Sequence, residues 1–179
     1  MVLQGERVQL RSTREHDLPF LQKLWNDGAV MRYVGYPQGL GIDEQGIQKW
    51  FEGLQSRRGV NCEHWVIENA EGEPVGEAYY KAESEYCGYQ AEKMAQIDIK
   101  LARCFWGQGY ASDALRTVIH YLFAKGFARI VVSPNLANEA ALKLYRRLGF
   151  KPKLRFRSKD TGEEHGVWVL ENSNAVEPS

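Results

Sequence analysis

The sequence predicts a single α/β (α+β) domain in which strands and helices alternate along the chain. Its 179 residues are 44% apolar and 26% charged, which suits one hydrophobic core and leaves little room for a second full domain. Apolar residues recur with a period of two in some segments and at helical spacing in others. Segments rich in Gly, Pro and polar residues separate them, and together these patterns give the order of the elements.

The first half of the chain predicts a strand, two helices and a hairpin. Residues 6–12 alternate as a strand does, and 14–27 carry leucines at helical intervals. A second helix is expected over 43–57 with Asp43 as its N-cap, and the intervening "YVGYPQGLG" predicts a loop. Two strand-like runs then flank a Glu-Gly-Glu-Pro turn, while "SEYCGYQAEK" predicts a variable connection.

The second half predicts strand, loop, helix, strand, helix and two final strands. In the strand over 94–101 three apolar residues share one face, so Asp98 falls on the other. A helix follows the "GQG" loop, "ARIVVS" predicts a strand, and "NEAALKLYRRLG" predicts a helix between an Asn cap and a Gly stop. We expect one domain over 1–171 and a flexible tail over 172–179.

Charge, cysteine spacing and hydropathy exclude several classes of protein. The formal net charge is zero, so the basic surface typical of nucleic-acid binding is not expected. Cys62, Cys87 and Cys104 are widely spaced, the histidines lack ligand spacing, and no metal site is expected. No segment approaches the ~20 apolar residues of a bilayer span, and no signal-peptide run begins the sequence. We therefore expect a cytoplasmic protein without a membrane partner.

The stretch "FWGQGYASDAL" (105–115) places two glycines directly before a predicted helix. Glycines let the backbone approach a ligand closely, and the start of a helix presents free N–H groups that favour phosphate. A pyrophosphate is the natural ligand, although the same pattern also fits a plain loop-to-helix turn. The third glycine of a dinucleotide fingerprint and the GK[ST] of a phosphate loop are both absent.

Two motifs resemble those of the GNAT superfamily of acetyl-CoA-dependent N-acetyltransferases. "WGQGYA" corresponds to Q/R-x-x-G-x-G/A with Trp106 at the first position, as in the branch that resembles ribosomal-protein amino-terminal acetyltransferases. "NEAALKLYRRLGF" (138–150) matches the more specific N-x-A-[SA]-x-x-L-Y-x-x-L-G-F, with Ala141 where serine is frequent. The resemblance spans nearly the whole chain. It implies a mixed, mainly antiparallel sheet of six to seven strands, four flanking helices and a V-shaped split between the central strands.

The same resemblance implies acetyl-CoA as co-substrate and direct acetyl transfer without a covalent enzyme intermediate. Leu101 and its neighbours would pair with pantetheine, and Asn138 would lie near the exit of that arm. Tyr145 would lie near the thioester sulfur and assist the departing thiolate, although its helical spacing also fits a core aromatic residue. The pyrophosphate would rest on the backbone of Trp106, Gly107, Gln108, Gly109, Tyr110, Ala111 and Ser112.

An alkyl ammonium, with a pKa of ~10, must lose a proton before it attacks a thioester, so a base or a water chain is required. Asp98 is the candidate base; the same carboxylate could instead hold a cationic substrate or be solvated. Glu77 and Glu83, on or beside the neighbouring strand, are reserve candidates for the acceptor site. The loop that borders the acceptor in this family supplies Tyr33 and Tyr36.

His64 stands at strand spacing beside Trp65 with no partner visible in the sequence, and we expect it to be structural.

The expected acceptor is a primary amine of a small molecule, with two alternative functions left open. "IDIKL" and "SPNLANEAALKLYRRLGF" are similar to antibiotic 6'-N-acetyltransferases and favour a small polyamine or aminoglycoside-like compound. "WGQGYA" favours a protein or peptide amino terminus. A degenerate member could also bind acyl-CoA without catalysis. Both a monomer and a homodimer are compatible with the sequence.

Overall fold

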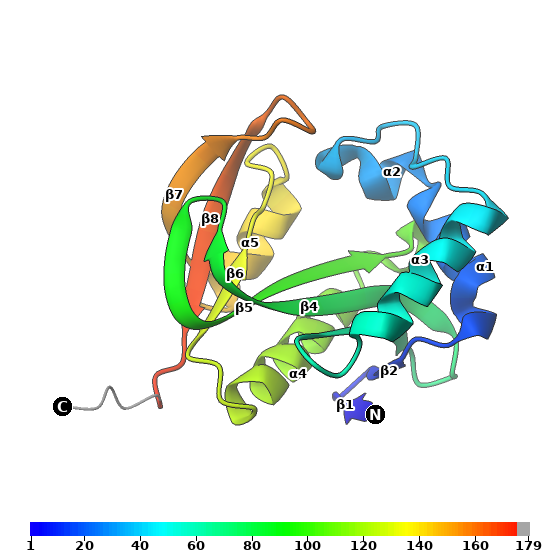
Figure 1. Ribbon diagram of the computed structural model, residues 1–179, viewed down its shortest axis with the longest axis horizontal. Helices are drawn as coiled ribbons and strands as arrows, with labels where there is room; N and C mark the ends of the chain where they lie inside the picture. Colours follow the sequence, from blue (N-terminus) through cyan, green and yellow to red (C-terminus); the bar gives the residue numbers. More distant parts are fainter. Residues whose placement is uncertain (175–179) are drawn as a thin grey trace.

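The computed structural model describes residues 1–174, and one mixed sheet of eight strands runs through it (Figure 1). The strand order is β1-β2-β3-β4-β5-β6-β8-β7, and every neighbouring pair is antiparallel except β5 and β6. The expected mixed, mainly antiparallel sheet is therefore confirmed, with eight strands instead of six to seven. The strands are β1 (Val2–Gln4), β2 (Gln9–Ser12), β3 (Cys62–Glu68), β4 (Pro74–Tyr86), β5 (Tyr89–Leu101), β6 (Arg129–Val132), β7 (Lys151–Arg157) and β8 (Glu164–Glu171).

Five α-helices flank the sheet in the part of the chain that the structure describes, one more than expected. The additional helix, α2, is a single turn, too short for a hydrophobic period to reveal it. The two expected caps are present: the Asp43 side chain accepts from Gly46 N at 2.7 Å, and that of Asn138 accepts from Ala141 N at 3.2 Å. The helices are α1 (Leu18–Trp25), α2 (Gly28–Met31), α3 (Glu44–Arg57), α4 (Tyr110–Ala124) and α5 (Glu139–Arg147).

The expected connection over 84–93 is wrong, because this stretch extends β4 and β5 into a long hairpin (Figure 1). Cys87 and Gly88 form its tip with φ values of 50° and 89°. A register shift between Glu83 and Glu85 interrupts the alternation that would otherwise mark a strand. Of the expected tail over 172–179, the last five residues lie outside the described residues.

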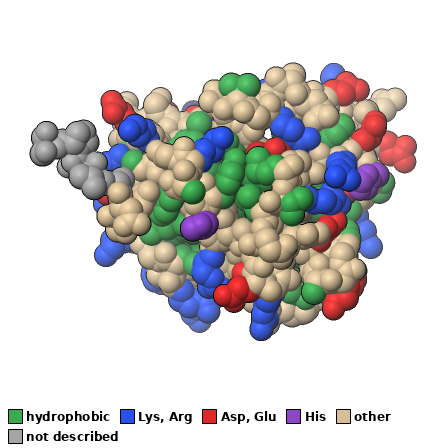
Figure 2. Space-filling model, turned by 90° about the horizontal axis from the view of Figure 1, so that it is seen from below, with side chains coloured by type: hydrophobic (Ala, Val, Ile, Leu, Met, Phe, Trp, Pro, Cys, Tyr) green, Lys and Arg blue, Asp and Glu red, His purple; other side chains and the backbone are tan. Residues whose placement is uncertain are grey.

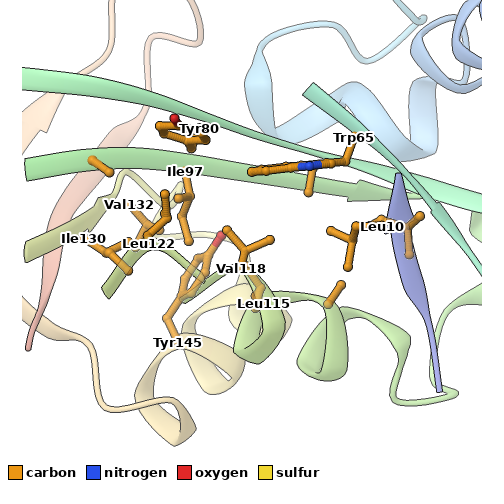
Figure 3. Packing of buried hydrophobic residues seen from close by; sticks show 14 of the residues in the cluster. Leu10, Trp65, Tyr80, Ile97, Leu115, Val118, Leu122, Ile130, Val132 and Tyr145 are labelled. Atoms are coloured by element: carbon orange, nitrogen blue, oxygen red, sulfur yellow. The ribbon is translucent and has the colours of Figure 1, made fainter. Parts of the chain in front are cut away.

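The helices pack against the sheet through separate apolar clusters. The largest cluster joins the sheet to α4 and α5, and in it Trp65 and Tyr80 stack with ring centroids 5.7 Å apart (Figure 3). A second cluster links α1, α2 and α3 through residues such as Leu21 and Phe51. In Figure 2 the charged groups of both signs are scattered around a band of apolar side chains. No helix within residues 1–174 has the length and apolar character that a bilayer crossing requires.

The two central strands separate beyond a short parallel contact. β5 and β6 pair from Met94 with Arg129 to Gln96 with Val131. β5 then continues to Leu101 while β6 diverges from it (Figure 1). The expected V-shaped split is thus present, and it leaves the last five residues of β5 without a neighbour on that side.

Candidate active site

A cavity of about 720 Å³ opens where β5 and β6 diverge. Its walls come from the end of β5, the loop before α4, the start of α5 and the α2 segment. Strands and helices distant in the sequence therefore meet at one hollow. Of the residues expected to contact the cofactor, all but Gln108 line it: Leu101, Trp106, Gly107, Gly109, Tyr110, Ala111, Ser112 and Asn138.

The loop before α4 presents a row of free backbone donors. Gly107 and Gly109 have φ values of 75° and 81°, a conformation that side chains disfavour, and Gly109 is the N-cap of α4. The N–H groups of residues 107–112 have no hydrogen-bond acceptor within residues 1–174. Several free donors at the positive end of a 15-residue helix suit an anion.

The edge of β5 turns its backbone toward the cavity. Trp106 Nε1 donates to the Leu101 carbonyl at 2.9 Å, so this carbonyl points away from β4. Backbone groups of a strand alternate between its two sides, so Ile99, two residues earlier, faces the same side. Its N–H donates to Oδ1 of Asp98 at 2.9 Å. An N–H and a carboxylate therefore lie together beside the split.

Asp98 lies opposite the apolar face of β5, as its position in the sequence predicts, and its side chain is 45% exposed. It does not line the cavity; its carboxylate pairs with Lys100, which does. Lys100 Nζ also lies 3.7 Å from Oε1 of Glu77. Burial alone lowers the pKa of Lys100, but the charges of Asp98 and Glu77 outweigh it and raise the pKa above its ordinary value. Lys100 is therefore a cation at neutral pH.

Glu77 is buried, and other side chains occupy both of its carboxylate oxygens. Trp25 Nε1 donates to Oε1 at 2.8 Å, and His64 Nε2 lies 2.5 Å from Oε2. Nδ1 of the same histidine lies 2.7 Å from Thr13 Oγ1, so His64 has the partners that the sequence does not reveal. Burial alone raises the pKa of Glu77, but His64 and Lys100 outweigh it and lower the pKa to about 2. Glu77 therefore does not line the cavity, and its carboxylate holds buried side chains and Lys100 in place.

Tyr145 is buried in the cluster between α5 and the sheet, with its ring centroid 5.4 Å from that of Phe150. The side chain points from α5 toward β5, where Ile97 lies (Figure 3). It is not among the residues that line the cavity. Burial raises the pKa of its hydroxyl, and the Asp98 charge adds to the rise. The hydroxyl is therefore protonated at neutral pH, the form that can donate a hydrogen bond.

The residues expected at the acceptor end divide between two places. Tyr33 lines the cavity together with its neighbour Arg32, whose guanidinium lies 4.6 Å from the Tyr33 ring centroid. Tyr36 does not line the cavity and is 42% exposed. Glu83 is also outside it and pairs with Lys81 at 2.8 Å.

The loop that carries Tyr33 is joined through Asn135 to the β7–β8 hairpin. Asn135 Nδ2 donates to the Tyr33 carbonyl at 3.2 Å and to Glu163 Oε2 at 2.7 Å. Gly35 fits against the Asp160 carbonyl, which a Cβ at Gly35 would approach to 3.0 Å. The Tyr33 segment is therefore held against the connection between β7 and β8.

Two residues that the sequence patterns do not reveal, Asp113 and Arg7, support the loop before α4. Asp113 accepts from the backbone N–H groups of residues 6–8, and Arg7 donates to the Gln108 carbonyl at 2.6 Å. An acid in the first turn of a helix is ordinary, and residues over 100 positions apart give no local signal of contact. Within residues 1–174 no group of three or more His, Cys, Asp or Glu side chains could hold a metal ion.

Comparisons with known proteins agree with this architecture. The acetyltransferase (GNAT) domain family matches residues 7–151. The uncharacterized N-acetyltransferase YoaA of Bacillus subtilis (strain 168) is 27% identical over 84% of this chain and 82% of its own. An L-methionine sulfoximine/L-methionine sulfone acetyltransferase of Pseudomonas aeruginosa is 25% identical over 90% of both chains. Spermidine N-acetyltransferase from Vibrio cholerae, solved with CoA and spermine, superposes with a TM-score of 0.80 at 18% identity, covering 94% of this chain and 98% of that one.

Proposed function

The chain belongs to the GNAT acetyltransferase family and is an N-acetyltransferase with acetyl-CoA as co-substrate, and we propose that its acceptor is the primary amine of a small molecule. The observation that carries the proposal is the cavity at the split, with free N–H groups at one end and the Tyr33 segment, held by Asn135, at the other. A long anionic cofactor and a small acceptor would meet between these ends, where β5 has no neighbour.

The free N–H groups of residues 107–112 support binding of the CoA diphosphate there. The pantetheine arm would then run along the backbone edge of Ile99 and Leu101, with Asn138 on the opposite wall. This path leads the thioester toward β5 and Tyr145. The order of phosphate, pantetheine and thioester along the cavity follows from the covalent order of the cofactor once its diphosphate lies at residues 107–112.

The transfer itself needs a proton acceptor, a stabilised oxyanion and a leaving thiolate. The ammonium of the acceptor loses a proton to Asp98, directly or through water, and the amine attacks the thioester carbon. A C–N bond forms and negative charge moves to the carbonyl oxygen, where the Ile99 N–H is the available donor once it leaves Asp98. The C–S bond then breaks as the carbonyl re-forms, the attacking nitrogen gives up its second proton to the departing thiolate directly or through water, and Tyr145 donates a hydrogen bond to that sulfur. Because burial raises the pKa of Tyr145, it acts chiefly as a hydrogen-bond donor.

The Tyr33 segment, which Asn135 joins to the β7–β8 hairpin, bounds the acceptor end and supports a small acceptor instead of a folded protein. Polyamines and aminoglycosides remain the first compounds to test, since the Vibrio cholerae enzyme was solved with spermine. Free carboxylates near the cavity would favour a polycationic acceptor, but Asp98, Glu77 and Glu83 each already have a basic partner, so the charges do not favour a polycation. Amino acids and their analogues therefore belong in the same panel, as the Pseudomonas aeruginosa relative suggests.

A CoA-release assay over four acceptor classes tests the proposal: polyamines, aminoglycosides, free amino acids and short peptides with free amino termini. We expect turnover on one of the three small-molecule classes and none on peptides. Turnover on peptides alone would assign a protein acceptor. Tight acetyl-CoA binding without turnover on any class would indicate a non-catalytic acyl-CoA-binding module.

A further inference from the structure

The turn between β1 and β2 is fixed to the first turn of α4 by one buried carboxylate. Asp113 is 4% exposed, and its Oδ2 accepts from Arg7 N at 2.7 Å and Val8 N at 3.0 Å. Its Oδ1 accepts from Glu6 N at 3.1 Å. Three backbone N–H donors compensate the cost of burying this carboxylate. Movement of the turn would leave the carboxylate buried without hydrogen-bond partners, which is unfavourable.

The packing of this turn is close enough to require glycine at one position. A Cβ on Gly5 would lie 2.6 Å from Asp113 Oδ2 and 2.8 Å from Thr117 Oγ1. The turn and α4 are therefore in direct contact, and the turn has a defined position relative to the loop before α4.

Arg7 extends from this fixed turn to the loop. Its Nη1 donates to the Gln108 carbonyl at 2.6 Å, and a Cβ on Gly109 would lie 3.3 Å from the same nitrogen. The Gln108 carbonyl and the Gly109 N–H belong to one trans peptide plane and point in opposite directions. Holding the carbonyl on the Arg7 side therefore turns the Gly109 N–H to the other side.

The Arg7 guanidinium makes few contacts that would contribute to the stability of the fold. Arg7 is exposed and makes no ion pair within residues 1–174, where its side chain has the Gln108 carbonyl as its hydrogen-bond partner. Exposed contacts of this kind contribute little to stability, whereas a fixed cation beside free N–H groups adds to the attraction for an anion.

We propose that Arg7 is a positioning residue for acetyl-CoA: from the turn clamped by Asp113 it orients the Gln108–Gly109 peptide so that the Gly109 N–H faces the diphosphate. The inference rests on the proposed binding of the diphosphate to residues 107–112. Arg7 is far from the glycine motif in the sequence. By this inference it contributes to the anion site an orientation of the backbone that the glycines alone do not provide.

The test compares the wild type with Arg7→Met, Arg7→Lys and the control Arg155→Met, an exposed arginine on β7 outside the cavity. Steady-state kinetics are measured with acetyl-CoA and with S-acetylpantetheine, which keeps the thioester but lacks the diphosphate. Loss of a charge-assisted hydrogen bond predicts a rise of about 10-fold in KM for acetyl-CoA in Arg7→Met, with kcat within about twofold. We expect partial rescue in Arg7→Lys and no change in KM for S-acetylpantetheine.

An unchanged KM for acetyl-CoA in Arg7→Met would overturn the inference, as would an equal rise with S-acetylpantetheine, which would indicate a general structural effect. Thermal unfolding of each variant shows that it is folded. Gly109→Asp distinguishes a failure of the inference about Arg7 from a failure of the proposed diphosphate site. If it weakens acetyl-CoA binding while Arg7→Met does not, the inference about Arg7 fails alone; if neither variant weakens binding, the placement of the diphosphate fails as well.

Discussion

His64 Nε2, on β3, lies 2.5 Å from Glu77 Oε2, on β4 next to β5, and both side chains are buried. The same carboxylate accepts from Trp25 and lies 3.7 Å from Lys100, whose ammonium pairs with Asp98. A continuous series of polar contacts therefore connects the interior of the sheet to the proposed base. Because buried ionic groups are costly when one partner is removed, this series fixes the position of Lys100.

Glu77→Gln should lower stability at neutral pH and flatten its acid dependence. The pKa of Glu77 is lowered to about 2 from an ordinary value of 4.5, so the folded state binds fewer protons than the unfolded state in that interval. The stabilisation is complete above pH 4.5 and is lost as the pH falls toward 2, a contribution of ~3 kcal/mol.

Urea denaturation of wild type and variant at a series of pH values checks this prediction. The difference in the free energy of unfolding should be largest near pH 7 and shrink below pH 4. Glu52→Gln, at an exposed position on α3, is the matched control. A difference that does not vary with pH would contradict the assigned ionisation.

Asp98→Asn should reduce kcat and remove the acidic limb of the pH–rate profile, because an amide cannot accept the ammonium proton. General-base assistance is typically worth ~10²–10⁴-fold. The substitution also frees Lys100, so acceptor KM and thermal stability are measured alongside the profile. A variant with the parental rate and the parental profile would leave Asp98 a role in the Lys100 ion pair alone.

Tyr145→Phe should reduce kcat with little change in acetyl-CoA affinity, because the ring stays in its cluster and the hydroxyl donor is lost. Thiolate is already a fair leaving group, since the pKa of an ordinary thiol is ~8.5, so the loss should fall at the low end of ~10²–10⁴-fold. Single-turnover measurements report the chemical step directly. A folded Phe variant with the parental single-turnover rate would make Tyr145 a core aromatic residue without a catalytic role.

Local features of the fold could be predicted from the sequence, whereas contacts between distant segments could not. The Asp43 and Asn138 caps and the glycines before α4 act within a few residues of themselves, so their motifs identify them. The hairpin over 84–93 could not be recognised, because a register shift disturbs its period.

The proposed site shows the same division. Eight of the nine expected cofactor residues line the cavity because one loop and two motifs carry them. The role of Glu77 depends on the His64 side chain 13 positions away, and that of Arg7 on the Gln108 carbonyl 101 positions away. No periodicity encodes such a pairing. Strand alternation correctly separates Asp98 from the apolar face, but it cannot show that Lys100 neutralises it.

Acetyl-CoA binding to Gly109→Asp, measured by calorimetry, tests the placement of the diphosphate most directly. The substitution adds an anion among the free N–H groups of residues 107–112. Gly72→Asp is the matched control, because Gly72 also has a positive φ, of 78°, and a Cβ there meets open space. We predict at least a ~10-fold loss of affinity in Gly109→Asp, the scale of one or more charge-assisted hydrogen bonds, and none in the control. Parental affinity in a folded Gly109→Asp variant would contradict the account.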